Sequence, residues 1–151
     1  FYAKGPDFRE HVVLEHLNFK GCKKRGSKAQ KLSMWNHGII REKAEQKAHL
    51  LGIRIATICA WKTSALAFDG SGSVTRDDNN HALATFTTGK QYNCDLSASY
   101  NIGARYFIRE LLKSLPATEE SRVKAKVPDV GRRTSCTLST LRVFVKELSA
   151  A

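Results

Sequence analysis

Two acidic residues stand at the boundaries of predicted secondary-structure elements. Glu15 closes a short apolar run, and Asp95 stands directly before a predicted helix. Strand interiors disfavour Glu, and a carboxylate at the end of a buried strand needs a partner. Carboxylate oxygens are the ligands that Mg²⁺ and Mn²⁺ prefer in proteins. Together, Glu15 and Asp95 therefore predict a site for a hard divalent cation.

The chemistry of such a site is phosphodiester hydrolysis. Two cations about 3.5–4 Å apart can stabilise the attacking and the leaving oxygen of a phosphodiester, usually with more carboxylates than these two. Each residue also has a simpler role open to it. Glu15 can pair with a Lys on an edge strand, and Asp95 can cap its helix through the N–H groups at the helix start.

The surrounding sequence predicts the elements that would position the two carboxylates. Residues 12–14 are β-branched and apolar, and residues 53–58 are rich in Ile, so both segments are typical of strands. Apolar residues repeat at helical spacing between them: Ile40, Ala44, Ala48 and Leu51. Gly52 stands where a helix-ending Gly belongs. The order of strand, helix, strand, insert and helix indicates an α/β protein, with a right-handed crossover if the two strands are parallel.

The insert and the tail are less regular. Residues 62–91 are rich in Gly, Ser, Asp, Asn and Thr, which predicts an irregular insert with one short hairpin. The helix after Asp95 should end near Pro116. In the basic tail, residues 114–151, the stretch 117–133 mixes charges with Pro and Gly, which predicts weak order. Four apolar residues predict one last short helix: Leu138, Leu141, Val145 and Leu148.

The chain is strongly basic. Its 151 residues include 25 Lys and Arg and 14 Asp and Glu, a formal net charge of +11. This charge favours nucleic acid as the partner, ahead of an anionic membrane surface or a role in solubility alone. One loop without acidic residues carries a group of these cations: Lys20, Lys23, Lys24, Arg25, Lys28 and Lys31. We expect this loop and Arg105 to contact phosphates, unless the loop serves solubility and Arg105 pairs with solvent or a nearby acid.

Cysteine spacing and hydropathy argue against a zinc protein and against a membrane-spanning protein. None of the four cysteines forms a Cys-x-x-Cys pair, so no zinc site is predicted and reduced thiols are the simplest interpretation. No run approaches the roughly 18 apolar residues of a membrane span. The first residues do not form a signal peptide, and they lack a starting Met. We therefore expect a cytoplasmic protein without a membrane partner, and a piece of something longer or a processed product.

Three segments, taken in order, resemble one protein family. Residues 12–21, VVLEHLNFKG, resemble the second RuvC motif of TnpB, the transposon-encoded OrfB family of RNA-guided DNA nucleases related to type V CRISPR effectors. Residues 55–64, IATICAWKTS, resemble the strand and entry to the family's zinc-ribbon insert. Residues 92–106, YNCDLSASYNIGARY, are similar to the third RuvC motif. The resemblance covers about residues 8 to 113 and places the family's Glu on Glu15 and its last catalytic Asp on Asp95.

The resemblance implies a fold, a cofactor and partners. Residues 1–113 would be the C-terminal portion of an RNase H-like (RuvC) nuclease domain, with DNA and a guide RNA as partners. Glu15 and Asp95 would ligate Mg²⁺ or Mn²⁺ during hydrolysis of DNA. The family's first catalytic Asp lies upstream of the Glu motif, so we expect this chain to be inactive unless a separate N-terminal part completes it. The alternatives are a non-catalytic nucleic-acid-binding module of the same fold and a gene remnant without independent function.

The insert departs from the family pattern. The family's first Cys-x-x-Cys pair would fall on Ala67 and Gly70, and neither residue is Cys. The second pair has no match before the third motif either. We therefore expect no zinc and a metal-free loop or hairpin that Phe68, Phe86 and Tyr92 hold together.

Overall fold

The chain has a mixed α/β fold. The computed structural model describes residues 2–4, 10–16, 37–132 and 134–150. Its first sheet has three strands in the order β1-β2-β3: β1 (Tyr2–Lys4), β2 (Glu10–His16) and β3 (Arg54–Cys59). β1 is antiparallel to β2, and β2 is parallel to β3 in a register that pairs Glu15 with Ile58. The parallel pair confirms the predicted strand–helix–strand unit.

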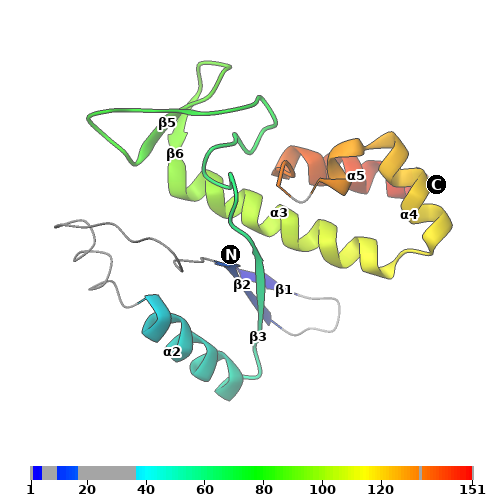
Figure 1. Cartoon of the computed structure of the whole chain (residues 1–151), viewed down its shortest axis with the longest axis horizontal. Helices are drawn as coiled ribbons and strands as arrows, with labels where there is room; N and C mark the ends of the chain where they lie inside the picture. Colours follow the sequence, from blue (N-terminus) through cyan, green and yellow to red (C-terminus); the bar gives the residue numbers. More distant parts are fainter. Residues whose placement is uncertain (1, 5–9, 17–36, 133, 151) are drawn as a thin grey trace, which may run out of the picture.

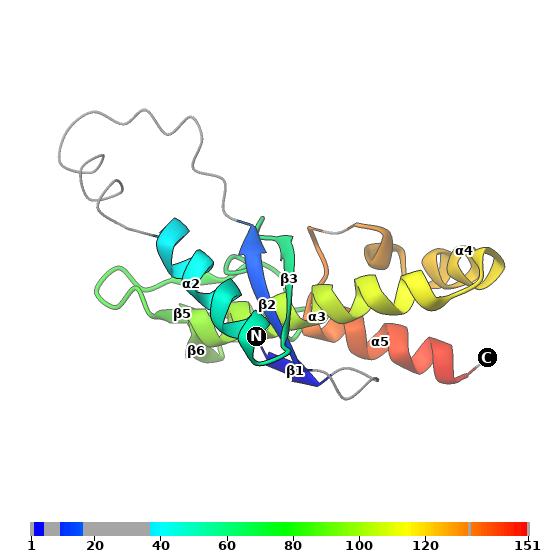
Figure 2. The ribbon, with the colours of Figure 1, turned by 90° about the horizontal axis from the view of Figure 1, so that it is seen from below.

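The helix of this unit is α2 (His37–Leu50), which contacts β3 (Figures 1 and 2). Ala48 is buried, whereas Ile40 and Leu51 of the predicted apolar stripe are exposed. Gly52 follows the helix with a φ of +69°. This left-handed conformation favours Gly, so the predicted helix end is confirmed.

The insert forms a second small sheet rather than one hairpin. Its strands are antiparallel in the order β4-β5-β6: β4 (Thr75–Arg76), β5 (Leu83–Thr85) and β6 (Gln91–Asn93). The ring of Phe68 packs edge-on against Phe86 and Tyr92, with centroids 5.5 and 5.0 Å apart. The three aromatic residues that were expected to hold the insert therefore do contact one another.

Two tight turns lie in the insert. Ala67 and Gly70 lie in one turn, where the N–H of Gly70 donates to the carbonyl of Ala67 at 3.2 Å. Phe86 and Gly89 form a second turn with the same bond, at 2.9 Å. The Lys90 ammonium lies 4.8 Å from the Phe68 ring centroid, a cation–π contact. Apolar and cation–π contacts thus hold the two turns of the insert together.

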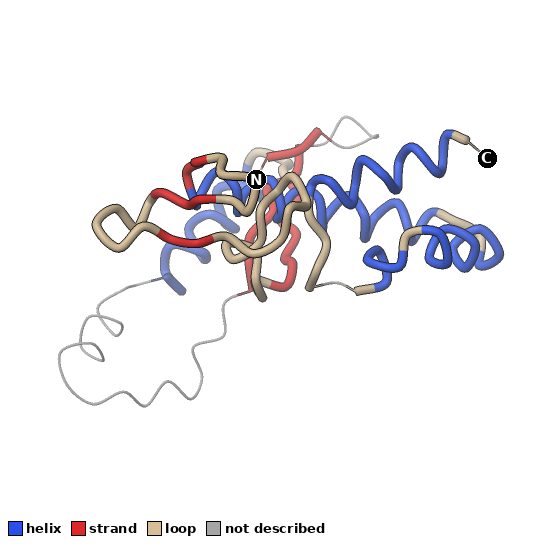
Figure 3. The backbone as a smooth tube through the Cα atoms, turned by 90° about the horizontal axis from the view of Figure 1, so that it is seen from above, coloured by secondary structure: helices blue, strands red, loops and turns tan. Residues whose placement is uncertain are grey.

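The long helix α3 (Cys94–Ser114) lies between the first sheet and the C-terminal helices (Figure 1). Three short helical elements follow it: α4 (Ala117–Lys126), the 3₁₀ helix η1 (Pro128–Gly131) and α5 (Leu138–Ser149). Figure 3 shows these helices on one side of the molecule and most strands and loops on the other. Among the described helices, none combines the length and the apolar character that a bilayer crossing requires.

The prediction of weak order for residues 117–133 is wrong for residues 117–132, and residue 133 lies outside the described residues. Val123, Val127 and Val130 are buried in one cluster with Ile108 of α3 and Phe144 of α5. Val123 lies in α4, Val127 caps the C-terminus of α4 and Val130 lies in η1, so two consecutive helical elements contribute to this cluster. The predicted last helix is confirmed as α5.

Candidate functional site

Glu15 lies at the C-terminal end of β2, the central strand of the first sheet. Val13, two residues earlier, is buried against Ile58 of β3 and Tyr106 of α3. Because side chains two residues apart share a face of a strand, Glu15 also lies on the α3 side of the sheet. Its carboxylate Oε1 accepts a hydrogen bond from the Thr63 hydroxyl. Among the described residues no Lys pairs with Glu15, which removes the edge-strand alternative within that part of the chain.

A buried set of hydrogen bonds continues from Thr63 into the molecule. The Asn101 side chain, which is 0% exposed, donates from Nδ2 to the carbonyls of Thr63 and Leu66 at 3.0 and 2.9 Å. Its Oδ1 accepts from the backbone N–H of Leu138 at 3.3 Å. The Glu15 carboxylate is therefore connected through two buried polar side chains to the first residue of α5.

Asp95 lies in the first turn of α3, and its side chain is exposed. The N-cap of this helix is Asn93, whose Oδ1 accepts from the N–H groups of Asp95 and Leu96 at 2.9 and 3.0 Å. Asn93 thus fills the capping role that remained open for Asp95. Asp95 precedes Ile102 by seven residues, and Ile102 packs against the Val13 cluster. Residues at this spacing share a helix face, so Asp95 lies on the side of α3 that faces the sheet.

Both carboxylates lie toward the same end of the sheet. α3 runs antiparallel to β3, because successive polar side chains of α3 reach carbonyls in the opposite order: Arg109 to Thr57, Arg105 to Cys59 and Asn101 to Thr63. The first turn of α3 therefore lies beyond the C-terminal end of β3. β2 is parallel to β3, so Glu15 stands at that end as well. The direct approach of the two carboxylates remains a prediction.

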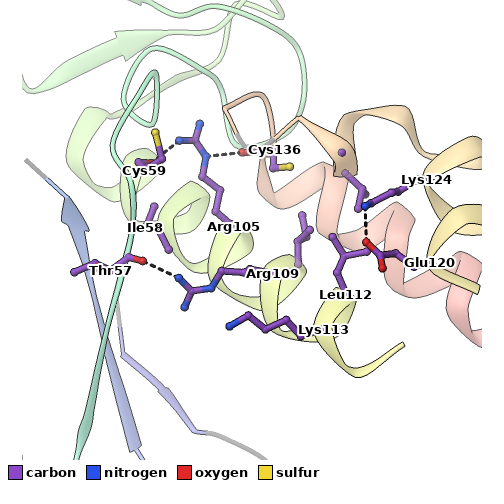
Figure 4. A pocket seen from close by; sticks show the side chains of 13 residues that line it. Thr57, Ile58, Cys59, Arg105, Arg109, Leu112, Lys113, Glu120, Lys124 and Cys136 are labelled. Atoms are coloured by element: carbon purple, nitrogen blue, oxygen red, sulfur yellow. Dashed lines mark hydrogen bonds and ion pairs between the residues drawn. The ribbon is translucent and has the colours of Figure 1, made fainter. Parts of the chain in front are cut away.

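Arg105 does not have the role that the sequence indicated. It is 5% exposed, and its guanidinium donates to four backbone carbonyls, of which Figure 4 shows those of Cys59 and Cys136. These acceptors come from two segments of the chain: Cys59 and Trp61 after β3, and Thr134 and Cys136 before α5. Burial lowers the pKa of Arg105, while the negative charge of Glu15 acts in the opposite direction. With four of its five donors used inside the protein, Arg105 is a structural cation rather than a phosphate contact.

A groove of about 620 Å³ lies between β3, α3 and α4 (Figure 4). Its cations have partners within the chain. Arg109 donates to the Thr57 carbonyl at 2.7 Å and, like Lys113, pairs with Glu110. Lys124 pairs with Glu120. Arg105, which also lines the groove, donates to backbone carbonyls. Because these four cations already have partners within the chain, the groove is a weak candidate for an anion site.

The predicted basic loop cannot be placed. Its six cations lie outside the described residues: Lys20, Lys23, Lys24, Arg25, Lys28 and Lys31. Within the described ranges, no group of three or more His, Cys, Asp and Glu residues could hold a metal ion. Glu15 and Asp95 remain a pair of oxygen donors. In donor type they fit Mg²⁺ or Mn²⁺, and the orientation that Thr63 gives Glu15 is typical of a ligand with an outer-shell partner.

Thr63, Asn93 and Asn101 are the polar residues that the sequence analysis did not assign to the site. Asn93 carries a local signal, because Asn is a favoured N-cap residue. Thr63 and Asn101 carry no local signal, because their partners lie far away in the sequence. Thr63 is 48 positions from Glu15, and Asn101 is 38 positions from Thr63.

Comparison with known proteins gives no match among protein-family models, curated proteins or solved structures. We therefore infer function from the residues of the site and their surroundings.

Proposed function

We propose that this chain is a nucleic-acid-binding part of a RuvC-like DNA endonuclease that resembles the TnpB family. One observation carries the proposal. The Glu15 carboxylate is held by a buried hydroxyl at the end of a central parallel strand, and α3 starts at the same end with Asp95 exposed on its sheet-facing side. The β2-α2-β3 unit followed by α3 supports an RNase H-like interpretation of the fold.

Glu15 and Asp95 would hold Mg²⁺ or Mn²⁺ in this proposal, which requires no zinc. The bound cation supplies Lewis acidity and stabilises negative charge on the phosphate oxygens. Glu15 keeps one carboxylate orientation because Thr63 donates to it, and Asp95 would approach from the first turn of α3.

A third carboxylate would come from a separate N-terminal part of the nuclease. The outer edge of β3 is a poor place for that part to join. The carbonyls of Thr57 and Cys59 in β3 accept hydrogen bonds from the Arg109 and Arg105 side chains, which disfavours the addition of another strand beside them. The N-terminal part would therefore dock at the opposite edge of the sheet, where β1 lies.

DNA and a guide RNA are the proposed partners, in a cytoplasmic setting. The net charge of +11 supports a polyanionic partner. The six cations of the basic loop remain the proposed phosphate contacts, and Arg105 is no longer among them.

Nucleic-acid binding across a salt series tests this proposal. We expect the Kd for single-stranded and duplex DNA to rise steeply with salt, with a log–log slope of about −0.9 in the association constant for each duplex phosphate contacted. Glu15→Gln and Asp95→Asn should keep this slope and lose Mn²⁺ binding. A Kd that stays the same between low and physiological salt contradicts the proposal. Salt-dependent binding with Mn²⁺ affinity unchanged in both variants favours the alternative, a binding module without hydrolysis.

A further inference from the structure

The Thr63 hydroxyl has a choice of two acceptors. Its Oγ1 lies 3.0 Å from the carbonyl oxygen of Ala60 and within hydrogen-bonding distance of Glu15 Oε1. A hydroxyl carries one proton, so it can donate to only one of them. An ionised carboxylate is the stronger acceptor. The proton is therefore directed to Glu15, and this bond fixes the position of Oε1.

Thr63 itself has little freedom to move. It is buried, and Asn101 donates to its carbonyl from a fully buried side chain. Arg105 holds the preceding segment through the carbonyls of Cys59 and Trp61, both at 2.8 Å. The hydroxyl is thus placed by the core of the molecule and not by a loose loop.

Glu15 depends on this hydroxyl for its orientation. Its side chain is half-buried at a strand end and has several rotatable bonds. Among the described residues, the second carboxylate oxygen, Oε2, has no hydrogen-bond partner. A fixed Oε1 is what an outer-shell partner provides for a metal-ligating carboxylate.

We infer that Thr63 is a positioning residue that orients Glu15 toward a divalent cation through its hydroxyl. This inference rests on the proposed metal site and adds to it a residue that does not touch the cation. The hydroxyl, rather than the shape of the side chain, carries the effect.

Mn²⁺ binding to the unmodified full chain and four variants of it tests this inference, with free Mn²⁺ measured by electron paramagnetic resonance; one of the four is Glu15→Gln. Thr63→Val keeps the shape and removes the hydroxyl, and we expect its Mn²⁺ Kd to rise about 10-fold to 100-fold. Thr63→Ser keeps the hydroxyl and should bind within about 2-fold of the unmodified chain. Thr87→Val is the matched control, because its hydroxyl donates to the Ser71 carbonyl in the insert. A cooperative thermal melt is required of each variant, and Thr63→Ala replaces Thr63→Val if that variant does not fold.

The outcomes separate this inference from the metal site itself. An unchanged Kd in Thr63→Val, or equal losses in Thr63→Val and Thr63→Ser, overturns the positioning role and leaves the site in place. If Glu15→Gln binds Mn²⁺ as tightly as the unmodified chain, the site and the positioning role are both overturned.

Discussion

The two carboxylates at this end of the sheet are held in opposite ways. Glu15 is fixed by Thr63, which Asn101 fixes in turn, so its surroundings belong to the core. Asp95 has its backbone held by Asn93, while its side chain is exposed. The difference separates a side chain that the fold orients from one that is free to adjust to a ligand. Changes around Glu15 should therefore reduce stability, whereas changes at Asp95 should affect ligand binding alone.

The largest effect is expected where the Glu15 region meets α5. Arg105→Met leaves four backbone carbonyls without their donor, so we expect the free energy of unfolding to fall by about 3–5 kcal/mol. Urea denaturation measures it, with Arg122→Met on the exposed side of α4 as control. Unchanged stability combined with weaker DNA binding would return Arg105 to the role of a phosphate contact.

Asn101→Ala should have the next largest effect. It leaves the carbonyls of Thr63 and Leu66 and the N–H of Leu138 without a side-chain partner. We expect a loss of roughly 2–4 kcal/mol in urea denaturation, because unsatisfied buried polar groups are costly. Asn79→Ala, at an exposed turn, is the matched control and should change little. Equal effects of the two substitutions would mean that the Glu15 region is no more rigid than the surface.

The thiol next to the Arg105 acceptors gives a pH-dependent effect. Burial raises the pKa of Cys136 from 9.0 to about 11, so the fold favours the protonated thiol. The protonated thiol therefore adds about 2–3 kcal/mol to the free energy of unfolding. This stabilisation is complete below pH 9 and is lost as the pH rises through 11. Unfolding free energies from pH 8 to 11 should fall more steeply in the unmodified chain than in Cys136→Val. Parallel curves for the two proteins would contradict a buried neutral thiol at this position.

The smallest effects are expected at the start of α3. Asn93→Ala removes the N-cap and should cost about 1 kcal/mol in stability. Asp95→Asn should change stability by less than about 0.5 kcal/mol, because the carboxylate does not cap the helix. Thermal and urea denaturation of both variants measure the difference. If Asp95→Asn destabilises the chain as much as Asn93→Ala does, the claim that the Asp95 side chain does not stabilise the fold is wrong.

The sequence predicts the elements of this fold where the signal is local. The strands around Glu15 and Ile58, the end of α2 at Gly52 and the helix after Asp95 all follow from spacing and residue type. The helix α4 is missed because Val123 and Val127 stand among charged residues, and their burial depends on Phe144 further along the chain.

Only the residues of the candidate site that have a local signal can be recognised from the sequence. Glu15 and Asp95 are recognisable because a carboxylate is unusual at a strand end and favourable at a helix start. The role of Arg105 is not recognisable, because its acceptors are backbone carbonyls from 29 to 46 positions away, and any residue type can supply a carbonyl. The contact of Thr63 with Glu15 likewise depends on the packing of β3 beside β2.

The central claim is that Glu15 and Asp95 share one divalent cation. Nuclear magnetic resonance of the isotope-labelled chain during a Mn²⁺ titration tests it most directly, because paramagnetic broadening marks residues near the ion. We predict that the signals of Glu15 and Asp95 broaden at the same Mn²⁺ concentration. Asp95→Asn should also reduce the broadening at Glu15. Broadening at only one of the two residues, or broadening at Glu15 that Asp95→Asn leaves unchanged, would contradict a shared site.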